Sequence, residues 1–334
     1  MITDKVLEAM DAKKLTLVVL LDLSKALDSL DYSRILAKLK TLGVSCTALK
    51  WFGSYLSVRQ QYVRIGAEAS SLGPISHGVP QGSILGPALF FIYINDLPNI
   101  PKFGSLDSYV DGSKLSLSFS VKDTCSVVEQ INDDLSKTAS WCCYNSLLIN
   151  PDKTKLMVLG TRKMLQRLPT DFHVTLLGKE VTRASSARDL GLQVDSTLSF
   201  DEHTTNTLLP CLGSLCQINR VRHLLGTRTL GNVINALVFS KLYYCSPVWS
   251  STTKKNISKL QKIQNFAART ISNSRKFDNI TPVLQELRWL PVSYYLMYTV
   301  GVFAFKCVKG LAPSYLSDCF LTKNKISRNC VLCR

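Results

Sequence analysis

The sequence predicts a mixed fold of helices and strands, either α+β or α/β, over its first 160 residues, followed by a mainly helical half. Short apolar runs alternate with segments of helical spacing up to Leu159, and after Asp201 helical spacing dominates. Of the 334 residues, 46% are hydrophobic. This is enough for a packed core, and it excludes a disordered or low-complexity chain.

The first apolar run, from Leu15 to Asp22, predicts a buried central strand that ends in a carboxylate. An acid at the end of a buried strand is expensive unless something pairs with it. Asp111-Gly112 lies between two strand-like runs and predicts a hairpin. We expect helices over residues 31–42, 47–56 and 124–143, and strands over 60–65, 106–110, 115–119 and 155–159.

In the second half, residues 172–176 and 190–194 resemble the two strands of another hairpin. A helix over residues 257–271 carries an apolar stripe, and a second face of it is basic. The basic face is either an ordinary solvated surface or a surface that meets phosphates. The stripe is Leu260, Ile263, Phe266, Ala267 and Ile271, and the basic residues are Lys255, Lys259, Lys262 and Arg269, with Lys254 beside them.

The net charge of +16 lies entirely in the second half of the chain. Residues 1–150 carry 14 basic and 14 acidic side chains, whereas residues 151–334 carry 26 and 10. No acidic residue occurs between Glu202 and Asp278. The basic half is therefore a candidate surface for a polyanion such as nucleic acid, although any solvated surface can carry lysines.

The eleven cysteines favour reduced thiols in an intracellular protein, because Cys142 and Cys143 are adjacent and the count is odd. Cys330 and Cys333 have the spacing of half a zinc site, but no partner follows them, so we expect no intact metal site there. No apolar run reaches the roughly 20 residues that a bilayer requires, so we expect no membrane span.

Asp22 and Asp111 are the best-placed acids of the first half. Carboxylates at a strand end and at a hairpin tip are a way to hold a divalent metal for phosphoryl transfer. The acids of this region also have plainer interpretations. Asp111 suits a turn, and Asp28 or Asp31 suits a helix cap. The residues alone leave these alternatives open.

Three segments together resemble a reverse transcriptase, and more narrowly the polymerase of non-LTR (LINE-type) retrotransposons, Jockey-like elements in particular. They are Leu21-Asp-Leu-Ser-Lys-Ala-Leu-Asp28, Gly78-Val-Pro-Gln-Gly-Ser-Ile-Leu-Gly-Pro87, and F-F-I-Y-I-N-D-L-P from Phe90 to Pro98. Asn150-Pro-Asp-Lys-Thr-Lys155 matches a further motif of that family. Later segments, including Tyr244 to Trp249 and Leu287 to Pro291, are also similar, so the resemblance runs from about Leu15 to about Phe320.

The resemblance implies a right-hand polymerase palm with a mainly helical thumb and C-terminal region, an α+β fold. It implies RNA-directed DNA synthesis, with two Mg²⁺ ions (Mn²⁺ is possible). The catalytic residues would be Asp22, Asp111 and Lys153, and the metal ligands Asp22, Asp111 and the carbonyl of Leu23. Leu27, Pro80, Gln81 and Gly82 would bind nucleotide and template, and Lys254, Lys255, Lys259, Lys262 and Arg269 the nucleic-acid backbone.

The sequence departs from this family at the hairpin tip, where Tyr109-Val-Asp-Gly112 replaces aromatic-Ala-Asp-Asp. One tip carboxylate is therefore replaced by glycine, which still favours the turn. Leu27 replaces the aromatic residue that screens the sugar 2′ position. Only 14 residues precede Leu15, so we expect the fingers subdomain to be largely missing.

The resemblance predicts four regions. They are a palm with residual fingers (1–160), a hairpin region at the palm–thumb junction (161–200), a basic thumb (201–275) and a helical C-terminal region (276–334). We expect this copy to be a weak or inactive RNA-directed DNA polymerase; the alternative is a non-catalytic nucleic-acid-binding remnant. The expected partners are an RNA template, a DNA primer and deoxynucleotide triphosphates, with no membrane and no protein partner. An intracellular, nuclear location is expected from the family only.

Overall fold

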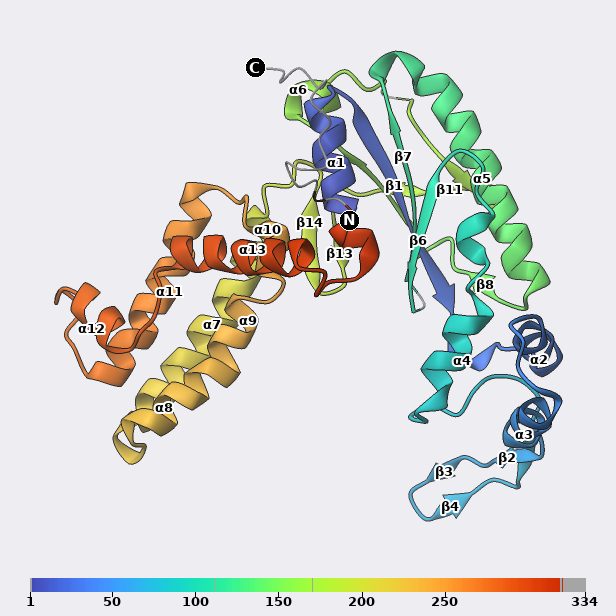
Figure 1. Cartoon of the computed structure of the whole chain (residues 1–334), viewed down its shortest axis with the longest axis horizontal. Helices are drawn as coiled ribbons and strands as arrows, with labels where there is room; N and C mark the ends of the chain where they lie inside the picture. Colours follow the sequence, from blue (N-terminus) through green and yellow to red (C-terminus); the bar gives the residue numbers. More distant parts are fainter. Residues whose placement is uncertain (1, 111, 170, 319, 321–334) are drawn as a thin grey trace. The chain divides into compact units, whose positions relative to one another are not determined.

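The computed structural model describes residues 2–110, 112–169, 171–318 and 320. The chain divides into two compact units, Met1–Ala187 and Arg188–Arg334 (Figure 1). The division falls inside the region 161–200 that the sequence assigned to a junction. Each unit is described by itself below.

Unit 1 is built on a six-stranded sheet in the order β12-β9-β1-β7-β6, with β8 also pairing β1. All pairs in it are antiparallel except that of β12 with β9. The expectation of a mixed sheet-and-helix fold is thus confirmed. The strands are β1 (Leu15–Ser24), β6 (Ser105–Tyr109), β7 (Gly112–Phe119), β8 (Leu148–Ile149), β9 (Lys155–Leu159) and β12 (Thr182–Arg183).

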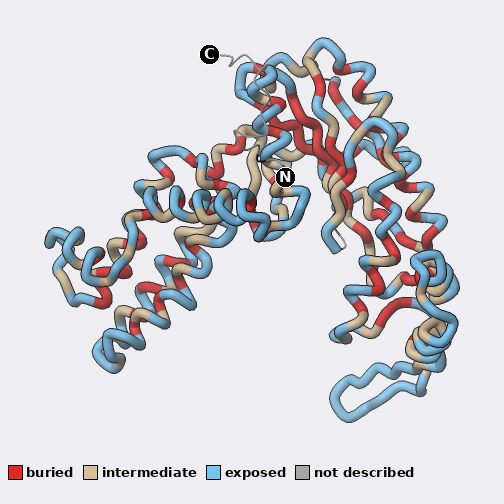
Figure 2. The backbone as a smooth tube through the Cα atoms, in the orientation of Figure 1, coloured by how far each residue is buried: buried red, intermediate tan, exposed pale blue. Residues whose placement is uncertain are grey.

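The side chains on one face of this sheet form the core of unit 1. The central strand β1 lies in the region that Figure 2 colours as buried. Alternate residues of β1 from Leu15 to Leu23 join one apolar cluster because successive side chains of a strand point to opposite faces. Helices α4 (Leu85–Tyr93) and α5 (Thr124–Tyr144) add Phe90, Ile131 and Leu135 to this cluster.

Helix α1 (Ile2–Asp11) contacts β1 and β7 over the opposite face of the sheet. Val6 and Val18 are buried there outside the main cluster, and Lys5 donates a hydrogen bond to Ser105 Oγ at 2.9 Å. Asp22 belongs to the same face, two pleats beyond Val18. Because Asp22 keeps 44% of its side chain exposed, this end of the face is open to solvent.

Residues 32–75 extend from the sheet as two helices and two small antiparallel ribbons. Asp31 caps the first helix by accepting a hydrogen bond from Arg34 N at 3.0 Å, as the sequence suggested. Strands β3 and β4 are exposed along their whole length. These elements are α2 (Tyr32–Thr41), α3 (Cys46–Leu56), β2 (Arg59–Gln61) paired with β5 (Gly73–Ile75), and β3 (Arg64–Ile65) paired with β4 (Glu68–Ala69).

Asp134 of α5 holds the turn that leads into β6. Its carboxylate is fully buried and accepts backbone N–H bonds from Lys102 at 2.6 Å, Phe103 at 3.0 Å and Gly104 at 2.7 Å. Gly104 has no room for a side chain, since a Cβ there would lie 2.9 Å from Leu115 Cδ1. A buried carboxylate surrounded by N–H donors is satisfied without a cation and fixes where β6 begins.

Unit 2 is mainly helical, as the sequence predicts. Helix α7 packs against α11, and α11 also contacts α8, α12 and α13. The elements are β13 (Ser186–Asp189), β14 (Leu192–Asp195), α7 (Asp201–Val221), α8 (Thr227–Ile234), a π-helical stretch (Asn235–Phe239), α9 (Ser240–Leu242), α10 (Ser246–Trp249), α11 (Lys254–Ser272), α12 (Thr281–Glu286), α13 (Val292–Val308) and α14 (Ser314–Ser317).

The chain enters α7 through a turn organised by Asp195. Its carboxylate accepts hydrogen bonds from the backbone N–H groups of Thr197, Ser199 and Phe200. Burial raises the pKa of Asp195, but the hydrogen bonds from Thr197, Ser199 and Phe200 outweigh it and lower that pKa below its ordinary value. The ionised carboxylate thus stabilises the start of the longest helix of unit 2.

Two sequence expectations are wrong. Residues 60–65 do not form one strand, because β2 ends at Gln61 and β3 begins at Arg64, and the two strands belong to different ribbons. Residues 172–176 and 190–194 do not pair with each other. Instead β10 (Thr175–Leu176) pairs with β11 (Lys179–Glu180), and β13 pairs with β14. Gly178 and Gly191 adopt positive φ angles of 77° and 86°, so each half makes its own tight turn and closes a local hairpin. The remaining short helix of unit 1 is α6 (Arg162–Leu165).

Within the part of the chain that the structure describes, no helix is long and apolar enough to cross a membrane. Cys330 and Cys333, the half zinc site of the sequence, lie outside the described residues.

We predict that Asp134→Asn lowers the free energy of unfolding by about 3 kcal/mol, because the amide keeps one acceptor oxygen but presents an N–H group in place of the other, so a buried backbone donor that faces this group loses its partner. Urea denaturation measures this change. Asp133→Asn is the matched control. Asp133 is exposed and pairs only with Lys137 at 2.6 Å, so that variant should change stability by no more than about 0.5 kcal/mol. Equal effects of the two variants would contradict the structural role of Asp134.

Candidate functional site

Asp22 stands where the central strand of unit 1 emerges from the core. The register of β1 against β7 places Asp22 directly opposite Gly112, the first residue of β7. Leu23, the predicted carbonyl ligand, follows Asp22 on β1 and pairs with Ile149 of β8. The predicted partner Asp111 lies outside the described residues. Its chain neighbour Gly112 is described, and it offers no carboxylate to the position opposite Asp22.

The turn after β8 brings Lys153 to Asp22. Lys153 Nζ lies 3.9 Å from Asp22 Oδ2, so the structure unites two of the predicted catalytic residues. Asn150 builds this turn. Its N–H donates to the carbonyl of Asp22 at 2.9 Å, and its Oδ1 accepts from the backbone N–H groups of Asp152 and Lys153 at 3.0 and 3.3 Å. Asn150 belongs to one of the motifs that resemble the family, but no role was predicted for it. The sequence Asn-Pro-Asp, which favours a turn, was the signal that could have predicted this role.

The loop with Pro80, Gln81 and Gly82 is fastened to the segment that follows β1. Gly78 N donates to Leu30 O at 2.8 Å, and Val79 N donates to Leu27 O at 2.9 Å. A Cβ on Gly78 would lie 2.8 Å from Asp28 Cα and from Asp28 O, so only glycine fits this contact.

Gln81 is held by Asp28, for which the sequence suggested only the role of a helix cap. Its Nε2 donates to Asp28 Oδ1 at 2.8 Å. Leu27, another residue of the predicted site, is half-buried and packs against the core cluster. Gln81 and Gly82 themselves are exposed, so the loop presents them to solvent from a backbone that is fixed.

Charged side chains of both signs lie on the sheet near Asp22, since the register of β6 places Asp107 opposite Lys114 of β7. Lys114 of β7 and Lys155 of β9 both pair with Leu20, two residues before Asp22 and on the same face. Among the described residues, no three His, Cys, Asp or Glu side chains gather closely enough to hold a metal ion. The Asp22 carboxylate and the Leu23 carbonyl are oxygen donors of the kind Mg²⁺ prefers, and they suit an ion that completes its coordination with substrate phosphates.

In unit 2 the predicted basic residues lie on α11, which begins at a Thr253 cap. Lys254, Lys255 and Lys262 are exposed, and Lys259 is half-buried. The predicted apolar stripe is buried except for Phe266, which is half-buried.

The predicted backbone contact Arg269 lies on the last turns of α11 and holds the loop that follows. Its Nε donates to Arg275 O at 3.1 Å and its Nη2 to Asp278 O at 3.2 Å. These bonds close the loop after α11, which gives Arg269 a structural task that the four lysines lack.

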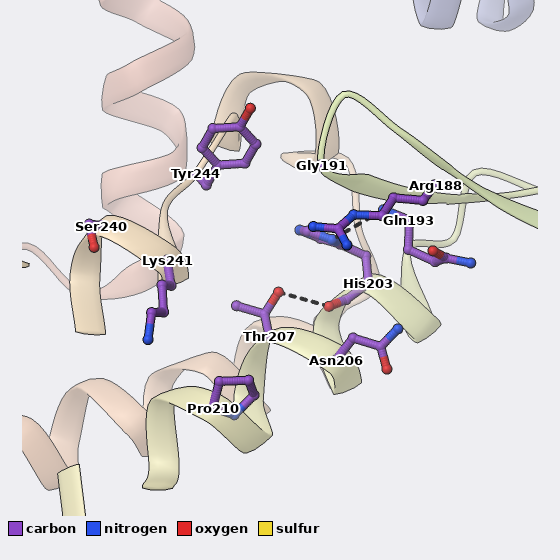
Figure 3. A pocket seen from close by; sticks show the side chains of 10 residues that line it. All are labelled: Arg188, Gly191, Gln193, His203, Asn206, Thr207, Pro210, Ser240, Lys241 and Tyr244. Carbon is purple, nitrogen blue, oxygen red and sulfur yellow. Dashed lines mark hydrogen bonds between the residues drawn. The ribbon is translucent and has the colours of Figure 1, made fainter. Parts of the chain in front are cut away.

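A cavity of about 610 Å³ lies elsewhere in unit 2, between β13–β14, α7 and α9 (Figure 3). Arg188 and Lys241 line it, and none of the ten residues drawn is acidic. His203 is buried beside them, and burial lowers its pKa, so at neutral pH its ring is uncharged. The cavity adds two cationic side chains to the basic surface of this unit.

Comparison with known proteins gives the following similarities. Residues 2–194 match the family described as "Reverse transcriptase (RNA-dependent DNA polymerase)". The "Probable RNA-directed DNA polymerase from transposon BS" of Drosophila melanogaster is 28% identical over 285 residues, which cover 81% of this chain and 30% of that protein. The "RNA-directed DNA polymerase from mobile element jockey" of the same species is 25% identical over 293 residues, covering 84% and 31%.

The chain thus spans about 30% of the length of these relatives. Among solved structures, a telomerase from Candida tropicalis in complex with a fragment of telomeric RNA is 13% identical. The match covers 90% of this chain and 52% of that one, with a TM-score of 0.44. That score is too low to support an argument here.

We predict that Gly78→Ala destabilises unit 1 more than Gly66→Ala does. Both glycines have positive φ, 85° and 62°, so both variants carry the backbone cost of about 1 kcal/mol. Only Gly78 also meets a backbone within 3 Å, whereas nothing lies within 4 Å of a Cβ on Gly66. We expect Gly78→Ala to cost about 2 kcal/mol more in urea denaturation. A difference near zero would show that the loop is not held against Asp28.

Proposed function

The chain belongs to the reverse transcriptase family, the RNA-dependent DNA polymerases, and from this premise we propose that Asp22 and Lys153 stand in a polymerase site that is weak or inactive in this copy. The chain is homologous to RNA-directed DNA polymerases of non-LTR retrotransposons, of which it spans about 30%. The observation that carries the proposal is the pairing of Asp22 with Gly112. A residue without a side chain stands opposite the one described carboxylate of the site.

The proposed reaction is attack of a primer 3′-OH on the α-phosphate of a deoxynucleotide, with pyrophosphate as the leaving group. The family implies a divalent metal. Asp22, Asp111 and the Leu23 carbonyl would hold Mg²⁺, two ions by family or Mn²⁺ in its place, which supplies charge neutralisation at the phosphate oxygens. Lys153 would place its ammonium group near the leaving pyrophosphate, to which it can give a proton.

Leu27, Pro80, Gln81 and Gly82 would position the template and the incoming nucleotide, since their loop is held to the segment after β1. Positioning of the reacting groups is a large part of catalysis in phosphoryl transfer. Loss of one preorganised charge from such a site costs about 3 kcal/mol, or roughly a hundredfold in rate. Gly112 in place of an acid is therefore enough to make this copy weak.

The finer assignments belong to the same proposal. Residues 1–160 would form a palm with residual fingers, 161–200 its junction, 201–275 a thumb, and 276–334 the C-terminal region. An RNA template, a DNA primer and deoxynucleotide triphosphates are the proposed partners. The nuclear location is a prediction from the family.

We predict that Gly112→Asp raises primer extension on an RNA template at least about tenfold over the unaltered chain, in Mg²⁺ or in Mn²⁺. The site has room for this change, because a Cβ on Gly112 would lie an ordinary 3.6 Å from Tyr109 O. Gly112→Asp with Leu27→Phe tests the second departure from the family. Asp22→Asn added to Gly112→Asp is the control that should abolish the gain.

Full activity of the unaltered chain would contradict the proposed weakness at the hairpin tip. Equal activity of all variants, including those with Asp22→Asn, would contradict the assignment of Asp22 to the site.

The second candidate function is nucleic-acid binding without catalysis. The observation that favours it is the set of exposed lysines on α11, in a stretch from 203 to 277 that holds no acidic residue. Such a surface would attract a phosphate backbone whether or not Asp111 and Asp22 can act.

We predict that changing Lys255, Lys259 and Lys262 to Gln weakens binding of single-stranded RNA and reduces the slope of log affinity against log salt by about 2. The slope falls because three fewer phosphates lose their counterions. Fluorescence anisotropy at several salt concentrations measures both quantities.

The control for this prediction removes the same charge from exposed lysines of unit 1: Lys13, Lys122 and Lys163. Those changes should leave the slope within about 0.5 of its original value. Equal effects of the two triple variants would show that binding follows net charge and not the surface of α11.

A further inference from the structure

Unit 2 contains a second cavity, of about 490 Å³, and half of the residues that line it are aromatic. Phe239 and Trp289 meet edge to face with ring centroids 4.7 Å apart, and Tyr243 and Tyr295 lie 4.0 Å apart. Phe239 and Tyr243 are 5.4 Å apart and join the two pairs. We call this cavity, together with the rim residue Tyr298, the aromatic pocket. Its volume lies within the range of ligand-binding sites.

The aromatic pocket is open to solvent on one side and polar at its base. Tyr298 is 58% exposed, whereas the four paired rings are half-buried. Gln264, only 2% exposed, donates through Nε2 to Tyr243 Oη at 3.1 Å and to Leu290 O at 2.8 Å. Because Tyr243 Oη accepts this bond, its own O–H proton can be donated to a ligand.

Burial raises the pKa of Tyr243 well above its ordinary value, so its hydroxyl keeps this proton at any physiological pH. The aromatic pocket thus offers flat apolar walls and one fixed hydrogen-bond donor.

Two irregular backbone features shape the aromatic pocket. Phe239 ends the π-helical stretch Asn235–Phe239, and such stretches are frequent at functional sites. Arg288 follows α12 with a φ of +54°, at a helix end closed by Trp289 N donating to Leu284 O at 2.8 Å. Glycine is the usual residue at such a position. Here it is an exposed arginine, which lines the aromatic pocket with its cationic side chain.

We propose that the aromatic pocket binds an unpaired nucleobase of an RNA strand, with Arg288 beside the phosphate of that nucleotide. Every base has a π-face that stacks on aromatic side chains, and arginine suits phosphate. The choice of ligand rests on the proposed nucleic-acid function. The aromatic pocket itself uses no residue of the site around Asp22.

The charge of the aromatic pocket decides against the other ligand that aromatic boxes take, a quaternary ammonium group such as a methylated lysine. None of the described residues that line the aromatic pocket is acidic, and Arg288 would repel such a cation. Helix α11, which supplies Gln264 to the aromatic pocket, also carries several lysines and thus further positive charge. Both features favour an anionic ligand with a planar ring.

The test compares a twelve-nucleotide single-stranded RNA with a strand of the same length that is abasic at every position, by fluorescence anisotropy with the full chain. The two strands carry equal charge, so a difference in affinity reports the bases. We expect the abasic strand to bind about tenfold more weakly. Tyr298→Ala should weaken binding of the intact strand about tenfold and leave the abasic strand unchanged, since the ring it removes stacks only on a base.

Tyr294→Ala is the matched control. Tyr294 lies on the same helix and is also 58% exposed, but it does not line the aromatic pocket. It should leave both affinities unchanged. Arg288→Gly suits the backbone at that position and should weaken both strands, because it removes a phosphate contact and no ring.

Equal binding of the two strands by the unaltered chain would overturn the base-binding proposal, while the salt-dependent binding of RNA by α11 could stand. Equal effects of Tyr298→Ala and Tyr294→Ala would overturn it too, and so would tighter binding of a trimethyl-lysine peptide than of the intact RNA. The lysine changes on α11 should weaken both strands alike, which separates failure of the surface from failure of the aromatic pocket.

Discussion

The hydrogen-bond register of β1 is the constraint on which the rest of unit 1 depends. This strand pairs with β7 on one side and with β9 and β8 on the other, so its register determines how three neighbouring strands are aligned along it. A slip of one residue would move Leu17, Val19 and Leu21 out of the core and turn Asp22 into it. The apolar side chains of β1 therefore fix the position of the Asp22 carboxylate.

The turn with Lys153 and the loop with Gln81 are each held in place by hydrogen bonds to the strand β1 or to the segment that follows it. Asn150 binds the carbonyl of Asp22 and shapes the turn of Lys153, while Gly78 lies against Asp28 and fixes the loop of Gln81. Asp134 does the same for the start of β6 on the far side of β7. Each device satisfies buried backbone groups first. The exposed side chains of the site are positioned as a consequence.

The sequence was sufficient for the elements whose pattern is local. Residues 155–159 form β9 as predicted, and the helix expected over 124–143 ends one residue later as α5. It was insufficient where pairing is a choice among partners. Residues 172–194 hold two glycine turns, and these closed two short hairpins where the strand patterns suggested a single one. The sequence pointed to Asp22 and Lys153, and the structure places their charged groups 3.9 Å apart. The hydrogen bonds of Asn150 and Asp28 join residues 128 and 53 positions apart, and no local pattern identifies such distant partners.

Catalysis and binding depend on different kinds of structure in this chain, and they are lost in different ways. The proposed polymerase site needs a carboxylate at one register position, so the glycine at 112 leaves the position opposite Asp22 without that charge. Attraction of a polyanion is a sum over many side chains spread along unit 2, and no one lysine of α11 decides it. A copy that changes at random therefore loses polymerisation well before it loses affinity for nucleic acid. We therefore expect the proposed nucleic-acid binding by the basic surface and the aromatic pocket of unit 2 to persist longest under such change.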